Sequence, residues 1–412
     1  MLNFVIQSFQ MKDKAIKRVE TICAQAIKEK KNTQPHQMSV CFSSAFRFDQ
    51  LSDSIKAFEN QPGTHVYTRY GNPTMESVAA KIAALEIAGS DISAHGLLTS
   101  SGMSAIYLAV TALLGKGDMI ITQENLYGGT TELFNKVIQP QGIKLVFIDL
   151  SNLEKVEKAL RQKPLHKIIY LETPSNPTLH CYDIKALAEL ASSYHAFLIV
   201  DNTFCTPIIQ QPLLLGADIV LHSTTKFIHG HGASTGGVVL VKEKTLFHQK
   251  IWQTMKLIGV NSNPMDAWMI QLGMMTLHLR MERHSENAFL LAKYLSSHPK
   301  VSHVNYPFLS YHPSFEVAKK QMSAGGAMLS FEAKTDVSGS KKMIDRLRLA
   351  AIAPSLGETG TMVLHPATSS HLKVDPELRK KEGITDGLIR VSVGLEHIDD
   401  IISDFDTALK KV

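Results

Sequence analysis

The chain has 412 residues, of which 44% are hydrophobic and 20% are charged, and its formal net charge at pH 7 is +5. This composition is typical of a soluble globular protein, and the length predicts two or three domains with sizeable cores. The excess of positive charge is small and is not concentrated in one tract, apart from a short run at 28–31 that a solvated helix end explains, so we expect no nucleic-acid partner.

Neither a membrane span nor a secretory signal is expected. No stretch of about 20 apolar residues is present, and residues 1–10 are too short and lack the basic start of a signal peptide. The four cysteines form no CxxC pair and have no metal-binding spacing. This pattern predicts reduced thiols in a cytoplasmic protein.

Three regions are predicted along the chain. Residues 1–62 contain a helical pattern at 11–30, followed by an extended polar arm that is too long to have its own core. We expect this arm to wrap around a neighbouring subunit. Residues 261–412 begin with a long helix at 266–296 and continue as a smaller α+β domain. The strands expected there include 326–331 and 388–393, and a last helix begins at about 398.

The middle region, 63–260, alternates between strands and helices. Its strands are short, apolar and rich in β-branched residues, as in parallel strands that are buried on both faces. This pattern predicts an α/β fold with a mostly parallel sheet and a site at the carboxyl ends of its strands. The strand candidates are 118–122, 144–148, 167–172, 196–201, 218–222 and 237–241, and helical patterns such as 183–193 separate several of them.

Two of these strands end in side chains that suit pyridoxal phosphate (PLP) chemistry. Asp201 ends one apolar strand, and Lys226 follows another on a glycine-rich loop. The amine of such a lysine forms a Schiff base with the cofactor aldehyde, and such a carboxylate keeps the pyridine nitrogen protonated. Taken alone, a strand-end lysine is usually solvated and an Asp-Asn pair usually forms a turn or a helix cap.

A phosphate site is predicted next to this lysine. Gly102 and Met103 open a helix, whose first amides lack intrahelical partners and favour an anion. A plain serine N-cap is the alternative at that helix start. Ser223 and Thr225 alternate before Lys226, so both hydroxyl groups could reach a phosphate held near the lysine.

Motifs from about residue 35 to the end jointly resemble one family, the PLP-dependent enzymes of cysteine and methionine metabolism, of fold type I. The group includes cystathionine γ-synthase, cystathionine γ- and β-lyases, methionine γ-lyase and O-acetylhomoserine sulfhydrylase. The resemblance implies a large domain with a seven-stranded type of sheet, at 63–260, and a smaller C-terminal domain. The matching motifs are Tyr67-Thr-Arg69-Tyr-Gly-Asn-Pro-Thr74, Ser101-Gly-Met103, Leu126-Tyr127-Gly-Gly-Thr130, Glu172-Thr-Pro-Ser-Asn176-Pro, Asp201-Asn-Thr-Phe, His222-Ser-Thr-Thr-Lys226, Ser355-Leu-Gly and Ile389-Arg390-Val-Ser-Val-Gly394.

The resemblance also implies a role for each site residue. Lys226 would bind PLP covalently and then move protons, and Asp201 would pair with the pyridine nitrogen. Tyr127 would stack on the ring and take part in proton transfer. The phosphate would be held by Gly102, Met103, Ser223 and Thr225, and by Tyr67 and Arg69 of an adjacent subunit. Arg390 would bind the substrate carboxylate through its two-pronged guanidinium, helped by Asn176 and Ser355. A homo-oligomer, a tetramer built as a dimer of dimers, is therefore expected.

The first choice of reaction is elimination at Cγ–S of a homocysteine-derived amino acid, as in methionine or cystathionine γ-lyases. This reaction gives a 2-oxo acid, ammonia and a thiol. The alternative is γ-replacement on O-acetylhomoserine or a related ester, as in the sulfhydrylases and cystathionine γ-synthase. Cystathionine β-lysis, aminotransfer and a regulator that has lost catalysis are less favoured.

Specificity signals in the sequence conflict. Gly129 stands where some methionine γ-lyases have cysteine, and Gly360 stands where relatives often have Glu or Lys. The loop at 230–237 resembles the sulfhydrylases, whereas the compact stretch at 260–277 is lyase-like. His229 and His231 form an HxH pair, but no third ligand is in view, so we expect no metal site.

Overall fold

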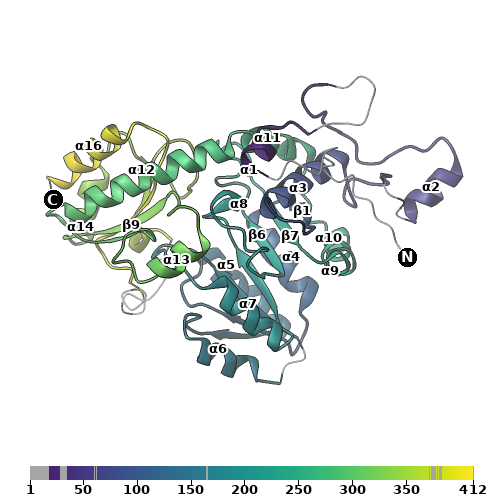
Figure 1. Cartoon of the computed structure of the whole chain (residues 1–412), viewed down its shortest axis with the longest axis horizontal. Helices are drawn as coiled ribbons and strands as arrows, with labels where there is room; N and C mark the ends of the chain where they lie inside the picture. Colours follow the sequence, from purple (N-terminus) through teal and green to yellow (C-terminus); the bar gives the residue numbers. More distant parts are fainter. Residues whose placement is uncertain are drawn as a thin grey trace. The chain divides into compact units, whose positions relative to one another are not determined.

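The computed structural model describes residues 18–27, 35–59, 61, 63–163, 166–370, 372, 377, 379 and 383–411 (Figure 1). The chain divides into two compact units, each built from two separate stretches of sequence. The first unit comprises Met1–Leu114 and Gln211–His278, and the second comprises Gly115–Gln210 and Leu279–Val412. The division at 1–62, 63–260 and 261–412 stays a prediction.

The larger sheet has seven strands, and three of them lie in the first unit. These strands have the order β1-β7-β6, with β7 antiparallel to both neighbours. Their bounds are His95–Thr99 for β1, Ile219–His222 for β6 and Gly237–Val241 for β7. The helices of this unit are α1 (Val19–Ala24), α2 (Leu51–Phe58), α3 (Pro73–Glu86), α4 (Gly102–Leu113), α9 (Lys244–Leu246), α10 (Gln253–Ile258) and α11 (Pro264–Met274), and a π-helical segment, Phe247–Trp252, joins α9 to α10.

The other four strands lie in the second unit and are all parallel, in the order β5-β4-β2-β3. They are β2 (Met119–Thr122), β3 (Lys144–Phe147), β4 (Lys167–Glu172) and β5 (Phe197–Asp201). Strands β2 and β4 are almost wholly buried, as expected for a sheet covered on both faces. The accompanying helices are α5 (Gly128–Leu133), α6 (Leu153–Leu160), α7 (Ile184–Ser193) and α8 (Thr206–Ile209), with a π-helical segment, Phe134–Ile138, and a 3-10 turn, Gln139–Gln141, after α5.

The second unit also contains a five-stranded sheet in the order β10-β11-β12-β9-β8. All of its pairings are antiparallel except that of β10 with β11. Helix α16 packs onto this sheet through Phe405, whose ring lies 6.0 Å from that of Phe331 on β9. The elements are α12 (Leu277–Ser297), β8 (Val301–Asn305), α13 (Phe315–Gln321), β9 (Met328–Ala333), α14 (Val337–Ile344), β10 (Ala351–Ile352), β11 (Met362–Leu364), a 3-10 turn (Pro366–Thr368), β12 (Leu388–Ser392) and α16 (Ile398–Leu409).

The predicted α/β class, with a mostly parallel large sheet and a second smaller sheet, is confirmed. All six strands predicted between 118 and 241 are present. Strand β1 was not predicted, and Gly96 within it explains why. A Cβ at Gly96 would lie 2.5 Å from the carbonyl oxygen of Ala79, so close packing against α3 requires a glycine that breaks the strand pattern.

Half of the predicted helix at 11–30 lies outside the described residues, and in the described half, 18–27, the helix ends early. Helix α1 stops at Ala24, and Gln25 is extended. The buried ammonium group of Lys81 donates hydrogen bonds to the carbonyls of Cys23 (2.9 Å) and Gln25 (2.8 Å). These two carbonyls accept hydrogen bonds from a buried ammonium group, and the helix does not continue past them. Burial in turn lowers the pKa of Lys81 to about 8.

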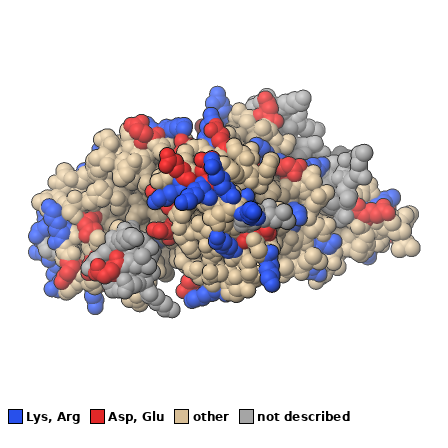
Figure 2. Space-filling model, turned by 90° about the horizontal axis from the view of Figure 1, so that it is seen from below, with Lys and Arg blue, Asp and Glu red and all other residues tan. Residues whose placement is uncertain are grey.

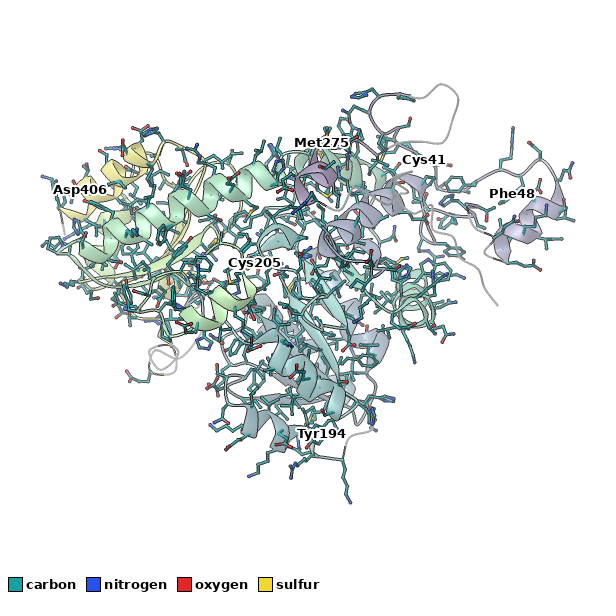
Figure 3. The ribbon with its side chains drawn as sticks, viewed as in Figure 1. Cys41, Phe48, Tyr194, Cys205, Met275 and Asp406 are labelled. Atoms are coloured by element: carbon teal, nitrogen blue, oxygen red, sulfur yellow. The ribbon has the colours of Figure 1, made fainter. Side chains whose placement is uncertain are left out.

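The predicted single helix at 266–296 is wrong. Helix α11 ends at Met274 and α12 begins at Leu277, with Met275 at the turn (Figure 3). The amides of Met275 and Thr276 bond three residues back, to Leu272 and Gly273, as in a tightened last turn. Apolar periodicity continues across the turn, so the sequence pattern did not show it.

No helix among the described residues is long and apolar enough to cross a membrane. On the face shown in Figure 2, Lys and Arg side chains are interspersed with Asp and Glu. The four cysteines, all of them described, form no disulfide, and Cys41 and Cys205 are labelled in Figure 3.

Gly273→Ala should destabilise the protein. A Cβ at Gly273 would lie 2.1 Å from the carbonyl oxygen of His229, so α11 or the loop carrying His229 must move. Overpacking of this kind costs about 1–3 kcal/mol, which urea denaturation would measure. Gly115→Ala is the matched control, because nothing lies within 4 Å of a Cβ there. Equal stability of the two variants would contradict this close approach.

Candidate active site

The segment that carries Lys226 forms a tight turn after β6 in the first unit. The Lys226 amide donates to the carbonyl of Ser223 (3.2 Å), and the Gly230 amide donates to the carbonyl of Lys226 (2.8 Å). Thr224 is fully buried, whereas Ser223, Thr225 and Lys226 are half-buried. The alternation predicted from the sequence is therefore present.

The start of helix α4 lies against this turn. Ser101 is the N-cap of α4, and its hydroxyl accepts from the Ser104 amide at 3.0 Å. A Cβ at Gly102 would lie 2.8 Å from Cβ and 3.1 Å from Oγ of Ser223. The structure thus brings together the predicted residues Gly102 and Ser223, with no room for a side chain between them. Met103 follows in the first turn of α4, where amide groups lack intrahelical partners.

Thr225 differs from the expectation in one respect. Its hydroxyl donates to the carbonyl of Gly236 (3.2 Å) and accepts from the Gly236 amide (2.9 Å). The single hydroxyl proton already has an acceptor in the protein. A phosphate contact from Thr225 would need this proton to turn away from Gly236, so its role in binding stays a prediction.

Tyr67 and Arg69 lie just before helix α3, also in the first unit. The Arg69 guanidinium stacks near the rings of Tyr70 (4.9 Å) and Tyr67 (5.6 Å) and donates to the carbonyl of Lys256. The Tyr67 side chain is 41% exposed. Both predicted residues are thus held on the surface of this unit.

Asp201 and Glu172 end two neighbouring parallel strands in the second unit. They are direct partners in the register of β4 and β5. Asp201 accepts hydrogen bonds from the amide (3.1 Å) and the hydroxyl (2.5 Å) of Thr203. Burial raises the pKa of Asp201, although the Thr203 bonds oppose this shift. Burial also raises the pKa of Glu172, and the charge of Asp201 adds to the rise.

Tyr127 is placed by the same Glu172. Its amide donates to Oε2 of Glu172 (2.8 Å), and the Thr130 hydroxyl donates to Oε1 (3.0 Å). The Tyr127 side chain is 47% exposed and immediately precedes α5. The backbone is therefore fixed while the ring remains accessible for stacking.

Arg390, Asn176 and Ser355 come together in the second unit, as predicted. Arg390 lies on β12 and is buried. Its guanidinium donates to Oδ1 of Asn176 (3.3 Å) and to the carbonyl of Ser355 (3.0 Å). Burial lowers the pKa of Arg390 to about 10, and the Tyr127 hydroxyl opposes that shift. The group is still a cation at neutral pH, and it is suited to an anionic ligand.

The HxH pair forms a local contact. The Nδ1 atom of His231 hydrogen-bonds with the carbonyl oxygen of His229 at 2.7 Å, and their rings lie 5.5 Å apart. Among the described residues, no group of three or more His, Cys, Asp or Glu side chains is placed to hold a metal ion.

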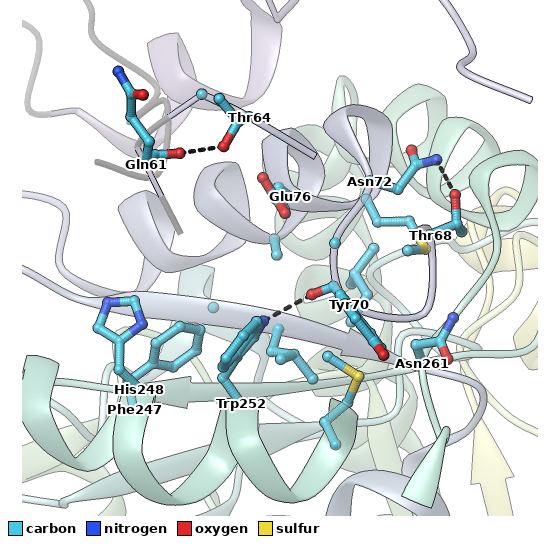
Figure 4. Close-up of a pocket in the computed structure, with 18 residues that line it drawn as sticks. Gln61, Thr64, Thr68, Tyr70, Asn72, Glu76, Phe247, His248, Trp252 and Asn261 are labelled. Carbon is cyan, nitrogen blue, oxygen red and sulfur yellow. Dashed lines mark hydrogen bonds between the residues drawn. The ribbon is translucent and has the colours of Figure 1, made fainter. Parts of the chain in front are cut away.

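A pocket of about 740 Å³, open solvent included, lies elsewhere in the first unit (Figure 4). Its lining includes Tyr70, Asn72, Glu76 and Trp252, and the Trp252 indole donates to the Tyr70 carbonyl at 2.8 Å. None of the predicted cofactor-binding residues lines it.

Together these observations fit PLP. The close approach of Gly102 to Ser223 places the start of α4 beside a serine hydroxyl, and the half-buried Lys226 carries an amine of the kind that reacts with an aldehyde. Asp201 offers an acid to a pyridine nitrogen, beside an accessible tyrosine ring. The fold and these residue sets define a PLP-dependent enzyme.

The chain belongs to the Cys/Met metabolism PLP-dependent enzyme family, whose model matches residues 20–410. It is 40% identical to L-methionine gamma-lyase of Fusobacterium nucleatum subsp. nucleatum over 91% of this chain and 93% of that protein. It is 44% identical to cystathionine beta-lyase of Lactococcus lactis subsp. cremoris (85% and 90%) and 38% identical to O-succinylhomoserine sulfhydrylase of Pseudomonas aeruginosa (93% of each).

The solved structures agree with this assignment. Cystathionine gamma-lyase from Lactobacillus plantarum, complexed with L-serine, matches with a TM-score of 0.87 and 36% identity over 95% of this chain and 98% of that one. The predicted family, fold and cofactor are confirmed. The cofactor is pyridoxal phosphate.

Sequence reasoning missed Glu172, which accepts from the Tyr127 amide, and Thr130, which donates to Glu172. Both residues lie in the family motifs, but the resemblance implied no role for either of them. The signal was present, because β4 and β5 are both apolar runs that end in an acid. When two adjacent parallel strands end at the same level, their last residues lie side by side.

Gly102→Ala should weaken PLP binding by about tenfold or more, because the new methyl group must displace Ser223 or the start of α4. Titration of apoprotein with PLP, followed by absorbance, would measure this. Gly115→Ala again serves as control. Unchanged affinity in a folded Gly102→Ala protein would exclude this contact from the phosphate site.

Proposed function

We propose that this protein cleaves the Cγ–S bond of a homocysteine-derived amino acid such as methionine or cystathionine. The reaction would consume water and release a 2-oxo acid, ammonia and a thiol. The observation that carries the proposal is the buried Arg390 cluster, which suits an amino-acid carboxylate, in a chain 40% identical to a methionine gamma-lyase.

The roles of the individual residues are part of this proposal. Bound PLP withdraws electrons from the carbon that carries the substrate amine, which makes its C–H bond acidic. Arg390 would bind the carboxylate and so orient that carbon, helped by Asn176 and the Ser355 carbonyl. Lys226 would bind the cofactor covalently and then accept and return protons at the substrate carbons. Tyr127 would stack on the ring, and Asp201 would supply the negative charge at the pyridine nitrogen.

The phosphate would be held by the amides of Gly102 and Met103 and by Ser223, with Thr225 adding a contact if its proton turns from Gly236. Their geometry supports this role, because Ser223 lies so near Gly102 that a Cβ there would come within 2.8 Å of the Ser223 Cβ. Hydrogen-bond donors at a helix start are well suited to a doubly charged phosphate.

Gamma-replacement is the second candidate. It is supported by the 38% identity to a sulfhydrylase and by the sulfhydrylase-like loop at 230–237. Beta-lysis of cystathionine is supported by the 44% identity to a cystathionine beta-lyase. These reactions share a cofactor and differ in their products, so identifying the products distinguishes the three reactions.

A product panel tests the proposal. The purified enzyme is given methionine, homocysteine or cystathionine, each without added thiol, and O-acetylhomoserine or O-succinylhomoserine with sulfide. Gamma-lysis gives 2-oxobutanoate from the first three, and cysteine from cystathionine. Pyruvate and homocysteine from cystathionine would show beta-lysis instead. Homocysteine made only from an ester and sulfide would show replacement.

Arg390→Lys is the matched variant in that panel. An ammonium group cannot reproduce the fork that holds Asn176 and Ser355, and loss of one charge-assisted bond costs roughly 1.5–3 kcal/mol, or about ten- to a hundredfold in kcat/KM. Fast transfer of amino groups to a 2-oxo acid, without lysis or replacement, would favour an aminotransferase.

We also propose a homo-oligomer, a dimer or a tetramer built from two dimers, in which Tyr67 and Arg69 complete a neighbour's phosphate site. Large apolar side chains on the N-terminal arm support this assembly, since Phe42, Leu51 and Phe58 are 67%, 78% and 63% exposed. Apolar surface of this kind is usually covered by a partner. A cytoplasmic location stays a prediction.

Mixed oligomers test the shared site. Subunits carrying Arg69→Ala are combined with subunits carrying Lys226→Ala, each inactive alone. If Arg69 serves the neighbour, one site of each heterodimer keeps both residues, and about half of the wild-type activity returns. No recovery in verified heterodimers would count against sharing.

A further inference from the structure

One buried acid, Glu172, has no role in the function proposed above. It ends β4, is 7% exposed, and lies in register with Asp201 on β5. Two carboxyl groups at neighbouring strand ends, one buried and the other half-buried, repel each other if both are ionised. Such a pair therefore holds a proton over a wide pH range.

The hydrogen bonds of Glu172 extend in one direction, toward the start of α5. Its carboxyl oxygens accept from the Tyr127 amide (2.8 Å) and the Thr130 hydroxyl (3.0 Å). Its backbone is fixed as well, because its amide donates to Oε1 of Gln123 (3.0 Å) and its carbonyl accepts from Nε2 of Gln123 (3.1 Å). Glu172 thus ties the strand edge to the segment that carries Tyr127.

The polar groups that face Glu172 come from three further elements and from its own strand. Asp201 faces it from β5, Thr130 and Tyr127 from the start of α5, and Gln123 from the end of β2. Tyr170 lies on β4 itself, and burial together with the charges of Asp201 and Glu172 raises the pKa of its hydroxyl, which therefore stays neutral. Among these groups Asp201 is the carboxylate, and its charge raises the pKa of Glu172.

The two acids accept the same kinds of hydrogen bond and differ in burial. Glu172 is 7% exposed, whereas Asp201 is half-buried, so an ionised carboxylate loses less hydration at Asp201. Asp201 accepts both an amide and a short hydroxyl bond from Thr203. Glu172 accepts from one amide and one hydroxyl, and the hydroxyl of Thr130 can equally rotate to accept a proton from the acid. A protonated Glu172 would therefore keep both of its contacts.

We propose that Glu172 is a positioning residue with two tasks: its carboxyl group fixes the segment that carries Tyr127, and it holds a proton so that Asp201 bears the single negative charge of the pair. The proposal rests on the role proposed above for Asp201, which needs a charged carboxylate. It assigns no contact of Glu172 with substrate or cofactor.

The protonation is tested on apoprotein, without substrate or PLP. In the unfolded chain Glu172 ionises near its ordinary value of 4.5, whereas in the folded protein it keeps its proton to higher pH. Folding thus takes up a proton, and the stability that wild type shows relative to Glu172→Gln must fall as the pH rises above 4.5. We expect the melting temperature of Glu172→Gln, minus that of wild type, to increase by roughly 2–4 °C between about pH 5 and 8.

Glu154→Gln is the matched control, because Glu154 is exposed in the first turn of α6. The pH dependence of the Glu172→Gln difference is read against that of the Glu154→Gln difference. A flat or falling difference for Glu172→Gln would overturn the protonation. The result is independent of which reaction the enzyme catalyses, so a failure here is distinct from a failure of the proposed function.

The assignment of the proton within the pair is tested on holoenzyme by its cofactor absorbance and PLP affinity. Glu172→Gln is neutral, like the protonated acid, and should bind PLP within about twofold of wild type with an unchanged absorbance band. Asp201→Asn should lose affinity and shift the band. A loss in Glu172→Gln as large as in Asp201→Asn would show that Glu172 bears the charge, and would overturn the proposal.

The positioning of Tyr127 is tested with Glu172→Met, which has a similar length but cannot accept the Tyr127 amide. We expect kcat to fall about ten- to a hundredfold, with KM and PLP affinity little changed, and Glu172→Gln to retain most of the wild-type kcat. Wild-type kcat in Glu172→Met would overturn this role. An equal loss in the Gln and Met variants would do so as well, since the amide side chain of Gln can still accept from Tyr127.

Discussion

The parallel register of β4 and β5 is the constraint on which the second unit's part of the site depends. Five consecutive pairs, from Ile168 with Phe197 to Glu172 with Asp201, fix the level at which both strands end. The residues before the two acids are apolar and mostly buried, so a slip by one position would turn those side chains to the opposite face of the sheet. Strand pairing, apolar packing and the Gln123 bonds to the Glu172 backbone thus set where Asp201 and Glu172 lie, and electrostatics then acts on that placement.

Burial at this site is compatible with charge only because the charged groups are hydrogen-bonded. Arg390 is nearly inaccessible, yet it donates to Asn176 and to Ser355, and both acceptors come from distant parts of the sequence. A cation that is already desolvated and oriented loses little freedom when a carboxylate binds. The same pre-arrangement is seen at Tyr127, whose backbone is bound while its ring stays exposed.

Sequence reasoning recovered most of the fold because parallel strands buried on both faces leave a strong pattern. It failed where a tertiary contact overrides local preference. Gly96 in β1 and Gly273 in α11 permit close backbone approaches, and nothing in apolar periodicity shows which glycine does so. The cluster of Arg390, Asn176 and Ser355 was predicted through family resemblance, and the structure brings these residues together. Glu172 was overlooked, since its importance lies in a register that only sheet pairing reveals.

If Arg390 binds the substrate carboxylate, as proposed, substrate choice must come from other residues, since every amino acid has a carboxylate. Gly360 is one such position, because the family resemblance leads one to expect Glu or Lys there. A Cβ there would lie 3.7 Å from Oε1 of Glu396, so a side chain begins to fit. That glutamate accepts from both the amide (2.6 Å) and the hydroxyl (2.8 Å) of Thr361, and it is thereby held beside Gly360. A second glutamate at 360 would add like charge next to Glu396, whereas a lysine would be attracted to it. With glycine at 360, the Glu396 carboxylate has neither an added negative nor an added positive side chain from that position. The charge beside Gly360 is then that of Glu396, in the loop after β12.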